Sequence, residues 1–155
     1  MRHAFFFTLC FAIAARAVPP STDTSIDRML DDWHQAASVA DESRYFGHAA
    51  PEFVFLGTDA GERWDLASFR AFAHPYFAKG KAWTFEPHDR HVQIAPDGDV
   101  AWFDEKLDSA SYGNCRGSGV VRRIDGRWRI AQYNLSIPIP NALAKEFVAR
   151  IRASK

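Results

Sequence analysis

Glu105 is the residue of this sequence whose setting could most readily support chemistry. Alternation along the extended segment 100–109 places it on one face with Ala101, Phe103 and Leu107, which makes it a carboxylate on an apolar face. A carboxyl group buried without a cation has a raised pKa and can act as a general acid or base. The alternative is a structural ion pair with Arg116 or Arg122, in which Glu105 would have no catalytic role.

Polar side chains on two further segments could join Glu105. Alternation along 127–136 puts Gln132 and Asn134 on the face of Trp128 and Ile130, and we expect this face to point inward. A small-molecule pocket typically combines apolar walls with a few polar groups that orient the ligand. The sequence therefore predicts a ligand pocket lined by aromatic and polar residues, namely Trp64, Tyr76, Trp83, Phe103, Glu105, Arg116, Ser118, Gln132 and Asn134.

A second candidate acid lies on the segment before the middle helix. Asp59, Glu62, Arg63 and Trp64 follow a short apolar strand and surround a turn. Such a loop could cover the mouth of a pocket. Asp59 would then be the second candidate for a catalytic carboxylate, and Glu105 the first. The alternative is a solvated turn in which only Trp64 packs against the core, since aromatic residues are more often core than ligand platform.

Motifs for metals, cofactors and nucleophiles are weak or missing. His88 and His91 are three residues apart, so a regular strand would place them on opposite faces. Gly117-x-Gly119 lacks the third glycine and the strand-turn-helix context of a dinucleotide loop, and it favours strand curvature instead. No Gly-x-Ser-x-Gly motif is present. We therefore expect no metal and no cofactor.

The first 17 residues have the pattern of a secretory signal peptide. Arg2 and His3 precede an apolar stretch, and Ala15-Arg16-Ala17 is a small-residue cleavage signal. Cleavage near Ala17 would export the protein to the periplasm or the medium. It would also remove Cys10, which leaves Cys115 without an intramolecular disulfide partner.

The hydrophobic pattern that follows is of the α+β class. Residues 21–48 have a helical stripe that includes Ile26, Leu30 and Trp33, with a break near residues 41–43. Residues 52–58 form a strand, and a helix begins at an Asp65 cap and ends or kinks at Pro75. Further elements are four meander strands and a last helix capped by Asn141; the strands are 83–95, 100–109, 116–124 and 127–136.

Length and composition limit the classes of protein that this chain can belong to. Its 155 residues are enough for one domain, and 47% of them are hydrophobic. The formal net charge of zero argues against nucleic acid as a partner, because a nucleic-acid-binding face must neutralise phosphates. No apolar run approaches the roughly 20 residues of a membrane span.

The order of elements and several stretches resemble the SnoaL-like branch of the nuclear-transport-factor-2-like (NTF2-like) superfamily. The resemblance covers roughly residues 25–141, after a signal peptide (1–17) and a short lead (18–24) and before a C-terminal helix (142–155). The stretches that carry it are FLGTDAGERW (55–64), FRAFAHPYFAKGKAW (69–83), AWFDEKLD (101–108) and RGSGVVRRIDGRWRIAQYNLSIPIPN (116–141).

The resemblance implies a cone-shaped α+β barrel, usually a homodimer, with a pocket inside the cone. It does not imply one activity, because the superfamily includes isomerases, dehydratases, hydrolases and association modules. We can match no set of catalytic residues from the enzymes of this superfamily to positions of this sequence. Three hypotheses remain: a small-molecule binder, an acid–base enzyme using Glu105 or Asp59, and an association module. For the dimer we expect the outer sheet face, with Trp102 and Tyr133 on it.

Overall fold

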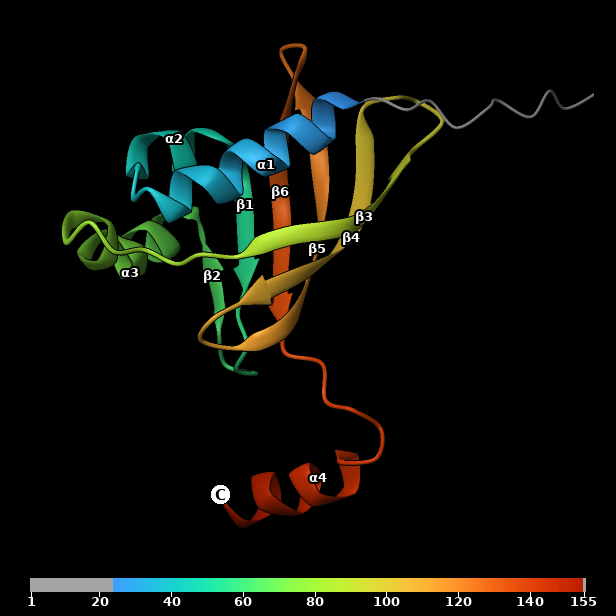
Figure 1. Cartoon of the computed structure of the whole chain (residues 1–155). Helices are drawn as coiled ribbons and strands as arrows, with labels where there is room; N and C mark the ends of the chain where they lie inside the picture. Colours follow the sequence, from blue (N-terminus) through green and yellow to red (C-terminus); the bar gives the residue numbers. More distant parts are fainter. Residues whose placement is uncertain (1–23, 155) are drawn as a thin grey trace, which may run out of the picture.

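The structure is a computed structural model that describes residues 24–154; the predicted signal peptide lies outside these residues. The described residues form four helices and six strands. Two helices come first and four consecutive strands come late in the chain, which is an α+β order (Figure 1). The helices are α1 (Thr24–Ser38), α2 (Glu42–Gly47), α3 (Leu66–Ala78) and α4 (Ala144–Ala153). The strands are β1 (Ala49–Leu56), β2 (Arg63–Asp65), β3 (Glu86–Ile94), β4 (Val100–Ser109), β5 (Gly113–Ile124) and β6 (Arg127–Ser136). None of the helices within 24–154 has the length and hydrophobicity needed to cross a bilayer.

The strands form one curved, unclosed sheet in the order β2-β1-β6-β5-β4-β3. The strands from β3 to β6 pair in sequence as the predicted antiparallel meander. β1 pairs parallel to β6, which brings the N-terminal half of the chain against the last strand. α1 packs on β3 and β6, and α3 packs on β1 and β2, so both helices lie in the concavity of the sheet (Figure 1).

The first two helices confirm the predicted stripe and the predicted break. Ile26 and Leu30 are 0% exposed and Trp33 is 3% exposed, which means that the stripe faces the sheet. α1 ends at Ser38. Asp41 then caps α2 by accepting a hydrogen bond from the backbone N–H of Arg44 at 3.0 Å.

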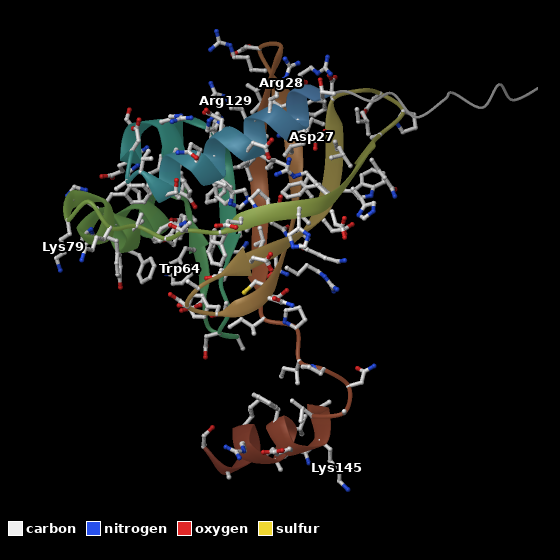
Figure 2. The ribbon with its side chains drawn as sticks, in the orientation of Figure 1. Asp27, Arg28, Trp64, Lys79, Arg129 and Lys145 are labelled. Carbon is white, nitrogen blue, oxygen red and sulfur yellow. The ribbon has the colours of Figure 1, made fainter. Side chains whose placement is uncertain are left out.

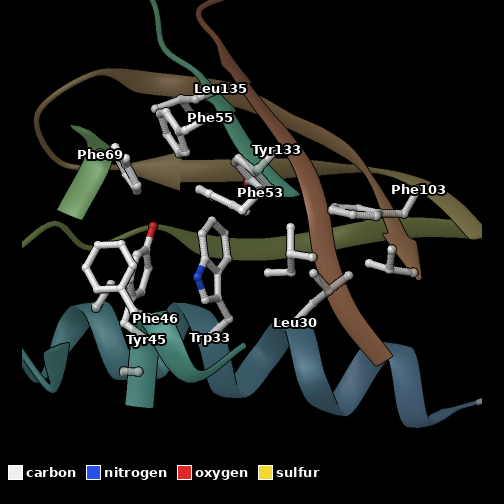
Figure 3. Packing of buried hydrophobic residues seen from close by; sticks show 14 of the residues in the cluster. Leu30, Trp33, Tyr45, Phe46, Phe53, Phe55, Phe69, Phe103, Tyr133 and Leu135 are labelled. Atoms are coloured by element: carbon white, nitrogen blue, oxygen red, sulfur yellow. The ribbon is translucent and has the colours of Figure 1, made fainter. Parts of the chain in front are cut away.

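Aromatic side chains from the helices and the sheet meet to form the core. Figure 3 shows Trp33 of α1 pointing toward Tyr133 of β6, and their ring centroids lie 4.5 Å apart. Phe55 of β1 and Phe69 of α3 stack with centroids 4.2 Å apart. Since each such ring buries a large apolar area, this contact of helix on sheet stabilises the fold.

Of the two outcomes predicted at Pro75, an end or a kink of the helix, the end is wrong, because α3 continues to Ala78. A proline in a helix interior removes one backbone hydrogen bond, which costs stability. Phe77 lies beyond Pro75 and is only 4% exposed. Its burial against the core compensates for the lost bond and keeps the last turn helical.

α4 stands apart from the rest of the molecule (Figure 1), and Figure 2 shows its Lys145 far from the sheet. None of its residues is buried. The predicted cap at Asn141 is wrong: the helix begins at Ala144, and the residue before it, Leu143, makes no side-chain cap. Four apolar side chains around α4 are 41–52% exposed, namely Leu143, Phe147, Val148 and Ile151.

Candidate functional site

A hollow lies between α3 and the sheet. Its volume is about 490 Å³, which is within the range of small-molecule sites. The walls come from β1, the β1–β2 turn, β2, α3, the segment after α3, the β4–β5 turn and Leu135 of β6. Most of the wall is aromatic: the rings are Phe55, Trp64, Phe69, Phe72, Tyr76, Trp83, Phe85 and Tyr112.

Helical spacing and a firm N-cap direct three of these rings into the pocket. Phe69, Phe72 and Tyr76 lie three and four residues apart on α3 and therefore share a face. The Asp65 carboxylate accepts from the Ser68 backbone N–H at 2.8 Å, which confirms the predicted cap. Trp64 on β2 lies beside α3 (Figure 2) and stacks on Phe72 with centroids 4.9 Å apart.

Glu62 is the one charged residue among the described residues that line this pocket. The turn that carries it is closed by the Gly57 backbone N–H, which donates to the Glu62 carbonyl at 2.9 Å. The Asp59 backbone N–H donates to Glu62 Oε2 at 3.1 Å. Both bonds hold the carboxylate at the edge of the aromatic wall.

Glu105 lies elsewhere, in a buried cluster that includes α1, β3 and β6. It is 1% exposed and does not line the pocket. His34 Nε2 lies 2.8 Å from Oε1, and the Tyr133 hydroxyl donates to the same oxygen at 3.0 Å. Arg90 Nε donates to Oε2 at 2.8 Å. An ionised carboxylate can only accept hydrogen bonds. Each of the two Glu105 oxygens has at least one such partner.

Arg90 anchors this cluster to α1. Its side chain is 9% exposed, and its guanidinium also lies 2.8 Å from Asp31 Oδ1 and 3.3 Å from Asp27 Oδ1. The predicted partner of Glu105, Arg116 or Arg122, is therefore wrong: the cation comes from the edge strand β3. Arg122 instead pairs with Glu52.

The cluster keeps Glu105 ionised. Burial alone would raise its pKa, but the hydrogen bond and charge of His34 and the charge of Arg90 outweigh burial, so the pKa lies below its ordinary value. Burial and the nearby Glu105 charge raise the pKa of Tyr133 well above its usual value, so its phenol stays protonated. The raised pKa expected for an unpaired Glu105 does not occur.

The structure does not bring the predicted site residues together but places them in separate regions. Trp64, Tyr76 and Trp83 line the pocket together. Phe103 is 3% exposed and belongs to the core, and Glu105 belongs to the buried cluster. Asp59 lies on the exposed turn beside the pocket, where its carboxylate accepts from the Gly61 backbone N–H at 2.8 Å.

The remaining predicted residues face outward. Arg116 and Ser118 alternate with Cys115 and Gly117, which are buried. Gln132 pairs with Val120, and Asn134 pairs with Ser118. The inward assignment of the four polar residues is wrong, and they gather on the outer face of the sheet; they are Arg116, Ser118, Gln132 and Asn134.

A bulge at Ala131 explains the error on β6. Val121 pairs with Ile130 and Val120 pairs with Gln132, so Ala131 has no partner of its own in β5. The extra residue reverses the alternation. Trp128 and Ile130 face inward before the bulge, and Tyr133 and Leu135 face inward after it. Tyr133, predicted on the outer face, is therefore 2% exposed.

Several functional candidates were missed in the sequence. The partners of Glu105, which are His34, Arg90 and Tyr133, come from three distant segments and share no motif. Phe72 could have been found, because it follows Phe69 at helical spacing on the same helix. Phe85 and Tyr112 stack 6.4 Å apart across the pocket wall, and only the tertiary fold brings them together.

No group of three or more His, Cys, Asp or Glu side chains among residues 24–154 is placed to share a metal ion. Cys115 is buried on β5, and burial raises the pKa of its thiol.

Solved structures show which class of fold this is. An NTF2-like protein of unknown function from Pseudomonas putida is 19% identical, with a TM-score of 0.65 over 79% of this chain and 92% of that chain. A proposed dehydratase of the NTF2-like family from Streptomyces avermitilis is 14% identical, with a TM-score of 0.66 over 79% and 100%. A proposed calcium/calmodulin-dependent kinase II association domain from Xanthomonas campestris is 20% identical, with a TM-score of 0.56 over 75% and 86%.

These likenesses define an NTF2-like α+β cone. Within that class, the model of the SnoaL-like domain matches residues 26–140, and the chain belongs to this family. No curated protein matches the chain.

Proposed function

We propose that this protein binds a small, partly apolar molecule in the aromatic pocket. The observation that carries the proposal is the composition of the wall, where eight aromatic rings surround about 490 Å³ of space. Three of these rings, Phe72, Tyr76 and Tyr112, are 42–53% exposed. Large exposed apolar patches usually mark a binding surface, and a ligand in the pocket would cover these rings.

The test uses N-phenyl-1-naphthylamine, a neutral apolar probe whose fluorescence rises on binding. We expect saturable binding to the wild type and an affinity about tenfold weaker for Trp64→Ala, which removes a pocket wall. Val39→Ala is the control, because Val39 is 56% exposed after α1 and does not line the pocket. Equal affinity of the wild type and Trp64→Ala would overturn the proposal, as would a lack of saturable binding.

We infer that the signal peptide is cleaved near Ala17 and that the protein is exported. The support is the sequence pattern alone, since residues 1–23 lie outside the described part of the chain. Intact mass spectrometry of the protein recovered from the periplasm and medium tests this. A mature chain that begins at Val18 is expected, and an uncleaved protein found only inside the cell would contradict it.

We also propose a homodimer formed through the outer face of the sheet. Trp102 donates its Nε1–H to Gln93 at 3.1 Å and remains 46% exposed there. A second copy can cover this face symmetrically, because a two-fold interface uses the same patch twice. The likeness to an association domain supports this proposal.

Light scattering tests the dimer. We expect twice the monomer mass at about 50 µM and a monomer for Trp102→Glu, since a buried unpaired charge opposes association. Val39→Glu is the control, because Val39 is 56% exposed at the end of the first helical region. A monomeric wild type, or a dimeric Trp102→Glu, would overturn the assignment.

A further inference from the structure

The formal charge on the pocket wall is negative only. Among the described residues, Glu62 is the only charged residue that lines the pocket, and no lysine, arginine or histidine does. The aromatic rings carry negative potential on their faces, which adds to the negative charge of the carboxylate. A ligand that completes this wall must therefore supply positive charge.

Within residues 24–154, the Glu62 carboxylate has no cationic partner. This carboxylate accepts one hydrogen bond from residues 24–154: the Asp59 backbone N–H donates to Oε2 at 3.1 Å. Glu105, in contrast, has His34 and Arg90 within 2.8 Å. Glu62 is half-buried, so a ligand cation beside it would be partly shielded from water, and the attraction would be stronger than at a free surface.

Gly57 brings the carboxylate and an indole ring together. A Cβ atom at this position would collide with Glu62 Oε2 and would lie 2.9 Å from Trp64 Cζ3. The absence of a side chain thus lets both groups pack over the same backbone position. Trp64 in turn stacks on Phe72, 4.9 Å between centroids, so the carboxylate borders a continuous aromatic surface.

We propose that the pocket selects an organic cation, with a protonated amine or quaternary ammonium held between Glu62 and Trp64 and an apolar ring among the other aromatic side chains. A cation within about 6 Å of an indole is attracted by the ring, and the carboxylate neutralises its charge. Anionic ligands of the same shape are rejected, because they would face a carboxylate and ring faces of like sign. This proposal rests on the proposed function of the same pocket.

The experiment compares three indoles of similar size by isothermal titration calorimetry on the full mature chain. Tryptamine is cationic, tryptophol is neutral and indole-3-acetate is anionic. We expect tryptamine to bind about tenfold more tightly than tryptophol, and indole-3-acetate to bind most weakly. The preference should decrease as salt is added, since part of it is electrostatic.

The Glu62→Gln variant locates the selectivity. Glutamine keeps the size of the side chain and an acceptor for the Asp59 N–H, so we expect the fold and tryptophol binding to be unchanged. Tryptamine affinity should fall to that of tryptophol. Glu146→Gln, on the exposed helix α4, is the matched control and should change none of the three affinities.

The outcomes separate the two proposals. Binding of the neutral naphthylamine probe without any preference for tryptamine overturns the cation proposal and leaves the pocket proposal standing. A tryptamine preference that survives in Glu62→Gln also overturns it. If neither the naphthylamine probe nor any of the indoles binds, the pocket proposal fails and the cation proposal fails with it.

Discussion

Glu105 is a carboxylate whose neighbours keep it charged inside the protein. His34, Tyr133 and Arg90 bond its two oxygens within 3.0 Å, and the residue is 1% exposed. Three hydrogen bonds occupy most of the acceptor sites of the carboxylate, which is buried and lies outside the pocket. Its geometry therefore supports a structural role, joining α1 to β3, β4 and β6.

Replacing Glu105 by glutamine should destabilise the protein. The change leaves the buried Arg90 guanidinium without its main counter-charge, and breaking a buried pair costs about 3 kcal/mol. Urea unfolding at neutral pH measures the loss. Glu52→Gln, which breaks the exposed pair with Arg122, is the control and should cost less than about 1 kcal/mol. Equal effects of the two changes would contradict a structural role for Glu105.

Gly117 provides the space into which Glu105 and Tyr133 fit. A Cβ atom there would lie 2.8 Å from Tyr133 Cζ and 2.9 Å from Glu105 Oε1. We expect Gly117→Ala to lower the free energy of unfolding by about 2 kcal/mol, because the added methyl group overpacks the cluster.

Gly47→Ala is the control for this change, since nothing lies within 4 Å of a Cβ at Gly47. Thermal unfolding compares the two variants. A neutral Gly117→Ala would mean that β5 can shift away from β6, and that the glycine serves the curvature of the strand instead.

Among the elements, α4 is the one that the domain does not use for packing. None of its residues is buried, and its Glu146–Arg150 ion pair at 2.8 Å is internal to the helix. An isolated helix of ten residues is marginal in water. Its apolar side chains therefore add little to the stability of a single chain.

Ending the chain after Asn141 should change the free energy of unfolding by less than about 0.5 kcal/mol, as is typical of exposed positions. Urea titration at low protein concentration, compared with the full mature chain, provides the measurement. A loss above about 2 kcal/mol would show that α4 packs against the sheet in solution.

The whole molecule should lose stability in acid. Hydrogen bonding by Arg44 is the main cause that lowers the pKa of Asp32 from 3.8 to about 2, against burial and with help from His48. The pKa of Glu105 is lowered as well. Because both folded-state pKa values lie below the unfolded ones, the folded chain binds fewer protons in this range, and stability decreases as the pH falls.

We therefore expect full stability from these groups above about pH 4.5 and a progressive loss from there toward pH 2. Urea unfolding at a series of pH values tests this. Glu105→Gln should show a shallower loss than the wild type, since the variant has no carboxyl group to protonate at this position. A stability that stays constant down to pH 2 would contradict the assigned pairs.

Local patterns in the sequence were enough to predict the class of fold. The stripe of Ile26, Leu30 and Trp33, the cap at Asp65 and the alternation of Ala101, Phe103, Glu105 and Leu107 all appear as expected. Each depends on neighbours within a few residues, and such periodicity is written directly into the chain. The SnoaL-like resemblance was confirmed over residues 26–140.

Contacts between distant segments were not predictable in this way. The bulge at Ala131 turns Tyr133 inward and Gln132 and Asn134 outward, and its cause is the pairing with β5 rather than any local residue. Arg90 meets Glu105 because β3 lies beside β4 and under α1. The pocket likewise gathers Glu62, Trp64 and Tyr112 from segments up to 50 residues apart along the numbering. Local sequence determines which faces are apolar, whereas strand register and helix docking determine which polar groups meet.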